Sequence, residues 1–124
     1  MLATAVLLLA AAQAPTQPQA IGRTELQRHD LGIRGREAVQ VRVDFSPGAI
    51  AARHRHPGEE LVFVLRGTLE LRIEGREPVM LRPGDTAFIP AGAVHEARNT
   101  GTGGASVLAT YVVEKGRPLV VPVP

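Results

Sequence analysis

Apolar and polar residues alternate along several short stretches of the chain. The clearest alternation covers residues 39–45, and a second covers residues 68–74. A period of two places successive side chains on opposite faces of a β-strand, so each stretch predicts a strand with one buried face. Glycine and proline turns separate these stretches from further expected strands at residues 49–56, 60–65, 78–81, 86–89, 94–98 and 105–113. The pattern predicts an all-β protein, either a barrel or a sandwich.

Two of the expected strands, at residues 60–65 and 105–113, are apolar on both faces. If Glu60 points into the protein, Leu61, Phe63 and Leu65 point outward and need a cover. A second sheet layer, an N-terminal strand or a second subunit would each provide one, and we expect a homodimer. The expected inward side chains are Val41, Val43, Phe45, Val62, Val64, Leu69, Leu71, Ile73 and Phe88.

The ends of the chain differ from its middle. Residues 1–12 are an apolar run too short to span a membrane, and Ala12-Gln13-Ala14 matches a signal-peptidase site. We therefore expect a signal peptide over residues 1–14, cleavage after Ala14 and a periplasmic or secreted protein; without cleavage the protein would be cytoplasmic. Residues 15–38 are expected to form a linker and edge segment, with a short strand around 24–27. The barrel would cover 39–115, and 116–124 would be an extended tail.

Composition narrows the classes of function. The 124 residues suffice for one domain, and the 14 basic and 12 acidic residues give a net charge of +2. The basic residues are scattered and aromatic residues are few, so we expect no nucleic-acid partner and, after cleavage, no membrane contact. The chain has no cysteine, which excludes disulfides, thiolate metal ligands and iron–sulfur clusters.

Four side chains of metal-ligand type stand next to turns. His54 and His56 are two residues apart, so on a strand both imidazoles leave the same face. Glu60 follows the turn at Pro57-Gly58, and His95 follows Pro90-Ala91-Gly92. Each histidine alone would ordinarily be a surface or core residue. Together these residues are candidate ligands of one ion, whereas we expect His29 to lie on the surface.

The residues around these ligands resemble the two motifs of the cupin superfamily over roughly residues 39–111. The first motif, G-x5-H-x-H-x3,4-E-x6-G, is filled by Gly48, His54, His56, Glu60 and Gly67. The second, G-x5-P-x-G-x2-H-x3-N, is filled by Gly84, Pro90, Gly92, His95 and Asn99. The resemblance implies an antiparallel double-stranded β-helix, a jelly-roll-like barrel, that binds a metal through His54, His56, Glu60 and His95. It also suggests a homodimer, but it does not imply one reaction.

The expected donor set indicates the kind of metal. Three neutral imidazoles and one carboxylate leave one net positive charge on a divalent ion and leave coordination positions open. We expect a divalent transition metal, with Fe or Mn preferred and Ni, Co, Zn or Cu as alternatives. We expect Glu59 to face away from the site and Asn99 to be structural.

Three functions fit a small substrate in an apolar pocket. The sequence shows no nucleophile–base pair, so chemistry would depend on the metal. The first is a dioxygenase-like oxidoreductase acting on a phenol, enol or diketone; the second is an isomerase or lyase. The third is a non-catalytic module that binds a metal or small ligand. Oxalate-type chemistry would require an additional acid or cation near the metal, and the pattern of inward residues contains none.

Overall fold

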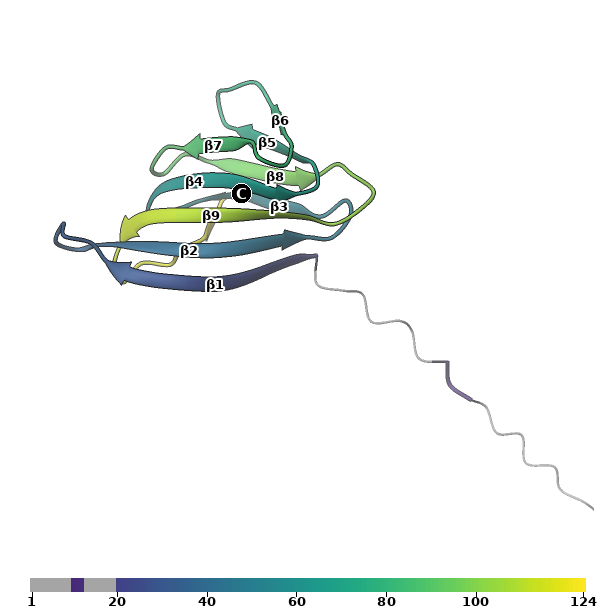
Figure 1. Ribbon diagram of the computed structural model, residues 1–124, viewed down its shortest axis with the longest axis horizontal. Coiled ribbons are helices and arrows are strands. Elements are labelled where there is room, and N and C mark those ends of the chain that lie inside the picture. Colours follow the sequence, from purple (N-terminus) through teal and green to yellow (C-terminus); the bar gives the residue numbers. More distant parts are fainter. Residues whose placement is uncertain (1–9, 13–19) are drawn as a thin grey trace, which may run out of the picture.

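A computed structural model describes residues 10–12 and 20–124 of the chain, and strands are its only regular elements over these residues. Ten strands form two five-stranded antiparallel sheets (Figure 1), in the orders β1-β2-β9-β4-β7 and β10-β3-β8-β5-β6. The predicted all-β, antiparallel jelly-roll barrel is confirmed. The strands are β1 (Ile21–Asp30), β2 (Arg36–Phe45), β3 (Ile50–Arg55), β4 (Gly58–Arg66), β5 (Leu69–Ile73), β6 (Val79–Leu81), β7 (Thr86–Ile89), β8 (His95–Asn99), β9 (Ala105–Glu114) and β10 (Val121–Pro122).

The first sheet is built around β9, which pairs with β2 on one side and β4 on the other. This explains why residues 105–113 are apolar on both faces. The core lies between the two sheets and consists mainly of β-branched and small side chains, which suit a pleated surface. Its members from the first sheet include Val39, Val41, Val43, Val64, Val107 and Val113.

The expectation that Phe88 faces inward is wrong, because 54% of this residue is exposed. Phe88 lies directly opposite Leu61 in the β4–β7 pair, and opposite residues share a face of the sheet. Glu60 lies opposite Ile89, which is 2% exposed, so Ile89 fills the inward position instead. Ile73 is only partly buried, whereas the remaining expected inward side chains are buried.

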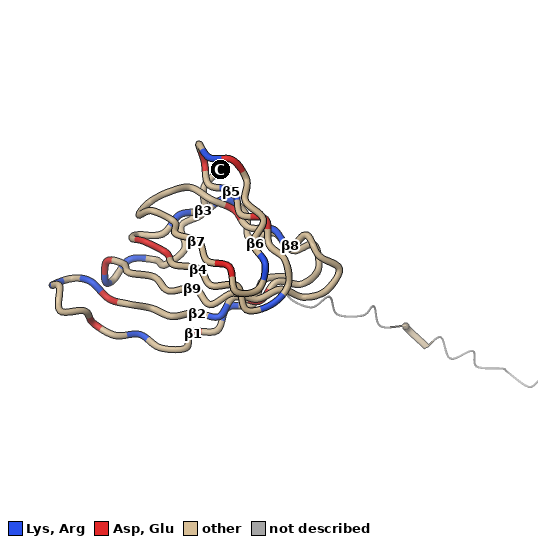
Figure 2. The backbone as a smooth tube through the Cα atoms, turned by 45° about the horizontal axis from the view of Figure 1, so that its top comes forward, with Lys and Arg blue, Asp and Glu red and all other residues tan. Residues whose placement is uncertain are grey.

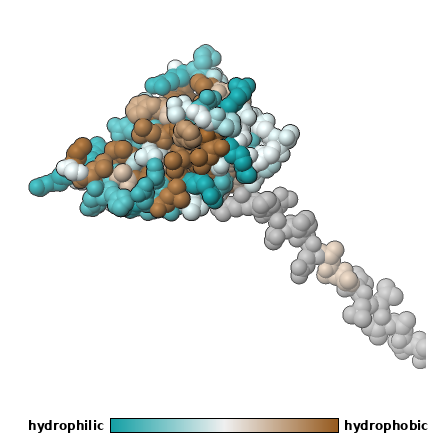
Figure 3. Space-filling model, viewed as in Figure 1, coloured by the Kyte–Doolittle hydropathy of each residue, from teal (hydrophilic) through white to brown (hydrophobic). Residues whose placement is uncertain are grey.

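The outer face of the first sheet carries an apolar patch that we call the outer apolar patch: Leu61, Phe63, Leu65 and Phe88. These side chains are 43–54% exposed, as expected for the first three. In Figure 3 apolar residues gather over the middle of this face. Strand β1 does not cover the patch, because it pairs edge to edge with β2 on the opposite side of β9. The described residues therefore leave the patch open to solvent.

Strand pairing extends beyond the predicted barrel limits of 39 and 115. The short strand expected around 24–27 is a ten-residue strand, β1, and β10 pairs with β3 near the C-terminus. Most of β1 is exposed, so it has no apolar alternation by which the sequence would mark its length. The expected signal peptide and its cleavage site fall largely on residues 1–9 and 13–19, outside the described residues, as does the start of the expected linker, residues 15–19. Export therefore stays a prediction.

Glycines allow the turns that orient the ligand-bearing strands. The motif residues Gly48, Gly67, Gly84 and Gly92 all have φ between 71° and 88°, a region that other residues rarely adopt. Gly58 is needed for a different reason, because a Cβ there would lie 1.9 Å from the backbone oxygen of Val112.

Basic and acidic residues are interspersed along the backbone (Figure 2). No helix within the described residues has the length and apolar character needed to cross a membrane.

Candidate metal centre

Neighbouring strands of the second sheet bring three predicted ligand residues together inside the barrel. His54 on β3 lies directly opposite His95 on β8, and His56 follows the end of β3. The ring centroids are 4.2 Å apart for His54 and His95, 4.9 Å for His54 and His56, and 5.0 Å for His56 and His95. One ring nitrogen from each residue lies within 4.8 Å of the others, and all three residues are buried. They form a group that could hold a metal ion.

An irregularity in the pairing of β3 with β8 places the His54 side chain on the inner face of the sheet. Ala51 pairs with Ala97 and His54 pairs with His95, so three steps on β3 match two steps on β8. The extra residue is a β-bulge, which lets residues three apart face the same side of the sheet. Ala51 and His54 are accordingly both buried, while Arg53 and Arg55 are exposed, as the sequence predicted.

Backbone carbonyls select one tautomer for all three imidazoles. The Nδ1 atoms of His54 and His95 lie 2.6 Å and 2.9 Å from the oxygens of Ala52 and Ala93, each two residues earlier. The Nδ1 of His56 lies 2.7 Å from the oxygen of Leu119 in the C-terminal segment. Because a carbonyl only accepts, each Nδ1 carries the proton and donates it. Each Nε2 is then left with a lone pair suited to a metal ion.

The Glu60 carboxylate lies against two of the imidazoles. Its Oε2 is 3.0 Å from Nε2 of His56 and 3.2 Å from Nε2 of His95. Nevertheless, Oε2 of Glu60 and Nε2 of His56 are buried without a properly oriented hydrogen bond. Given the tautomer set by the Leu119 carbonyl, two electron pairs face each other, and a buried cation between them would satisfy both.

The ionisation of the site suits a divalent cation. Burial lowers the pKa of His54 to about 4, so this imidazole is neutral at ordinary pH. Burial alone would raise the pKa of Glu60, but hydrogen bonds and positive charge from His56 and His95 in their protonated form outweigh it and lower the pKa to about 2. The donor set therefore includes an ionised carboxylate and nitrogen atoms, which transition metals accept and which lack the sulfur typical of structural zinc sites.

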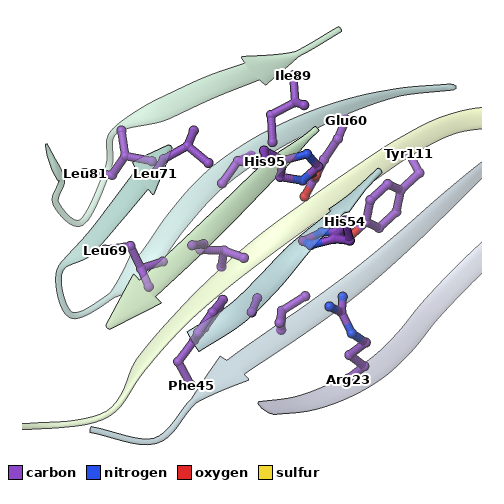
Figure 4. A pocket seen from close by; sticks show the side chains of 15 residues that line it. Arg23, Phe45, His54, Glu60, Leu69, Leu71, Leu81, Ile89, His95 and Tyr111 are labelled. Atoms are coloured by element: carbon purple, nitrogen blue, oxygen red, sulfur yellow. The ribbon is translucent and has the colours of Figure 1, made fainter. Parts of the chain in front are cut away.

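A small cavity of about 40 Å³ opens beside His54, Glu60 and His95 (Figure 4). This volume admits only a few water-sized groups. Most of its lining is apolar and comes from both sheets, as the sequence indicated. Two polar residues, Arg23 and Tyr111, also line it, and neither was identified from the sequence.

Tyr111 lies beneath the site on β9, where its ring centroid is 4.6 Å from that of His56 and the residue is 1% exposed. Burial and the negative charge of Glu60 raise the pKa of this phenol, and the positive charge of Arg23 opposes the shift. Tyr111 is therefore a protonated group beside the ligands. Its alternation with Val107, Ala109 and Val113 is a signal that would have found it.

Arg23 corrects the expectation that no cation lies near the ligands. It belongs to β1, where the sequence shows no alternation, so no local signal marked it.

The other three residues that the sequence analysis singled out, His29, Glu59 and Asn99, behave as predicted. His29 is exposed, and Glu59 points away from the cavity. Asn99 is structural, because its Nδ2 donates to the oxygens of Phe45, Ser46 and Gly103 and its Oδ1 accepts from the nitrogen of Gly101.

Comparison with known proteins gives partial but consistent likenesses. The chain is 47% identical over 45 residues to the dimethylsulfoniopropionate lyase DddQ of Ruegeria pomeroyi, covering 36% of this chain and 22% of that protein. It is 37% identical over 75 residues to germin-like protein subfamily 2 member 1 of Arabidopsis thaliana, covering 56% and 34%. The chain thus spans about a third or less of the length of these relatives.

A solved structure of an oxalate oxidase superposes on 94% of the chain with a TM-score of 0.70 and 28% identity, covering 61% of that protein. The family model described as "Cupin domain" matches residues 41–116, which contain both histidine motifs and Tyr111. With more than half of the chain matched, and with the barrel and its ligand-type residues arranged as described, the chain belongs to the cupin family.

Proposed function

We propose that this protein is a metal-dependent oxidoreductase, in which His54, His56, Glu60 and His95 bind one divalent transition metal. The carrying observation is the buried pair of Glu60 Oε2 and His56 Nε2, which face each other without a proper hydrogen bond. Fe or Mn remains the preferred ion. The match to the oxalate oxidase structure supports redox chemistry at such a site.

The bound ion would supply a Lewis acid and a one-electron redox centre with open positions for substrate and dioxygen. The chain's own residues prepare the site around it. Glu60 carries a negative charge that stabilises the cation, and the Nδ1–H bonds hold the imidazoles in orientation. The apolar walls limit water, and Tyr111 holds a proton next to Glu60. A dioxygenase-like reaction would insert both oxygen atoms into a small chelating phenol, enol or diketone.

A lyase is the second candidate, favoured by the buried Tyr111 and by the local likeness to a dimethylsulfoniopropionate lyase. In such a reaction the ion would act only as a Lewis acid, and no oxygen would be consumed. Activity that persists under anaerobic conditions with redox-inert Zn would identify a lyase or isomerase and would exclude the oxidoreductase.

The test begins with elemental analysis of protein purified without added metal. Fe(II)- and Mn(II)-loaded protein is then tested for oxygen uptake with enols, diketones, phenols and small carboxylates. We expect uptake with at least one compound, and we expect His54→Ala to abolish it. If no loaded form consumes oxygen with any compound, the oxidoreductase is excluded; a metal-loaded protein without any turnover would be a binding module.

We also propose that two copies associate through the outer apolar patch. Leu61 and Phe88 lie side by side on β4 and β7, and the described residues leave both exposed. A second copy would remove this apolar surface from water. Sedimentation should show a dimer that Phe63→Glu converts to monomer, whereas the same change at the exposed polar residue Gln27 should not. A monomeric wild-type protein would contradict this proposal.

A further inference from the structure

Arg23 faces the same interior as the metal-ligand residues although it belongs to the outermost strand of its sheet. It lies opposite Val43 in the β1–β2 pair, and Val43 is 3% exposed, so both side chains are on the inner face. Figure 4 shows the Arg23 side chain extending from β1 toward His54 and Tyr111. Its charge influences the pKa of Tyr111, which agrees with this position.

Arg23 also separates two hollows. It lines the inner cavity of about 40 Å³ and an outer groove of about 410 Å³, and Ala51 and His54 line both as well. The groove lies between β1 and the C-terminal segment, with apolar walls formed by Ile21, Ile50, Val120 and Pro122. A ligand that occupies both hollows would therefore lie beside Arg23.

The charge of Arg23 is not neutralised by any ion pair within residues 10–12 and 20–124. The nearby arginines differ: Arg42 pairs with Asp44 at 3.0 Å, and Arg53, the other arginine of the groove, pairs with Glu74 at 2.7 Å. Among the described residues, Glu60 is the only acid that lines either hollow, and its carboxylate faces His56 and His95. An anionic group of a ligand would find an available partner at Arg23.

We propose that Arg23 binds the carboxylate of a small substrate and holds it between its guanidinium and the ion at the three histidines. A guanidinium matches a carboxylate in geometry and can donate two hydrogen bonds to it. The inner cavity admits only a few heavy atoms, so the charged end of the substrate occupies it. An apolar substituent lies in the outer groove. The position of the ion in this proposal rests on the proposed function. The presence of a guanidinium without an ion-pair partner does not depend on that function.

The test measures equilibrium binding and does not depend on turnover. Glycolate and 2-hydroxyhexanoate, each with its neutral primary amide as a control, are titrated calorimetrically into Mn(II)-loaded and metal-free protein. Arg23→Gln removes the charge at an exposed edge position. Arg98→Gln is the matched control, since Arg98 is exposed on β8 and lines neither hollow. Metal content and circular dichroism are recorded for every variant.

We expect Arg23→Gln to weaken carboxylate binding at least about tenfold, because a charge-assisted hydrogen bond is lost. Amide binding, metal content and Arg98→Gln should match the wild type, and Arg23→Lys should be intermediate. The proposal is overturned if Arg23→Gln binds the carboxylates with an affinity within twofold of wild type, or if its affinity for the amides falls by the same factor as its affinity for the carboxylates. It is also overturned if the wild type binds neither carboxylate at millimolar concentration. If the wild-type protein does not retain metal, that result counts against the proposed function instead. The titration of metal-free protein then still compares the carboxylate affinity of Arg23→Gln with that of the wild type.

Discussion

The two sheets contribute different chemistry to the same site. The β10-β3-β8-β5-β6 sheet carries His54 and His95, whereas the β1-β2-β9-β4-β7 sheet carries Arg23, Glu60 and Tyr111. The histidines stand where the strand ladder is interrupted, at a bulge and after a turn, so nearby carbonyls are available to accept from Nδ1. Glu60 and Tyr111 occupy regular positions opposite each other on long strands. The imidazoles are thus oriented by irregular backbone, whereas Glu60 and Tyr111 point inward because of the regular alternation of side chains along their strands.

The largest expected effect follows from removing an imidazole of the second sheet. His54→Ala or His95→Ala should reduce metal occupancy to background, because each removes one nitrogen donor from a buried group of three. Elemental analysis and competition with a chelator measure this loss. His29→Ala, which changes an exposed histidine of the first sheet, is the control. Full metal occupancy in His54→Ala would contradict the assigned site.

A smaller effect is expected on the first sheet from Glu60→Gln, which keeps the shape of the side chain and removes its charge. Metal affinity should fall at least about tenfold, because the anionic donor beside His56 and His95 is lost. Glu59→Gln is the matched control, since the neighbouring side chain points away from the cavity. Equal affinities in the two variants would show that Glu60 is not a ligand.

The C-terminal segment offers a test of imidazole orientation that leaves every ligand in place. Deleting residues 117–124 removes the Leu119 carbonyl that accepts from His56 and also removes β10. Metal affinity should fall about 10–100-fold, the usual effect of losing a partner that orients a ligand. Deleting only residues 123–124 keeps Leu119 and β10 and should have little effect. Chelator competition on both proteins decides the outcome, with circular dichroism confirming the fold.

The most gradual effect is the acid sensitivity of the metal-free protein. His54 has a pKa of about 4 when folded and 6.5 as its reference value, so the unfolded chain binds more protons between these values. Stability should therefore decrease as pH falls from 6.5 toward 4. Glu60, with a folded pKa of about 2 against 4.5, extends the decrease from 4.5 toward 2.

Urea unfolding between pH 7 and pH 3 measures this decrease. His54→Gln should flatten the upper part of the profile, and Glu60→Gln should flatten the lower part. A metal-free wild-type protein whose stability does not change with pH would contradict both assignments. Adding metal should shift the loss of stability to a different pH, because the ion binds only the deprotonated ligands.

Several features of the fold and the site follow from local patterns. Alternation predicts that Val62 and Val64 are buried and that Leu61 and Phe63 are exposed. This alternation follows from the extended backbone of a strand, in which successive side chains point to opposite faces. Turns are marked by glycines such as Gly67 and Gly92, whose positive φ the structure confirms. Phe88 is the instructive error, because Ala87, Phe88 and Ile89 are consecutive apolar residues in a four-residue strand and show no alternation that determines which face is inward. Its facing was decided by pairing with Leu61.

The sequence by itself determined the all-β class and the four candidate ligand residues, because both depend on spacings of a few residues along one strand or turn. Only the tertiary structure decided the length of β1, the place of Arg23 above the cavity and the bond from His56 to the Leu119 carbonyl. The bond from His56 joins residues 63 positions apart, the cavity at Arg23 is lined by both sheets, and the length of β1 follows from its pairing with β2. No local pattern records such contacts, since they arise from burial and pairing after the chain has folded.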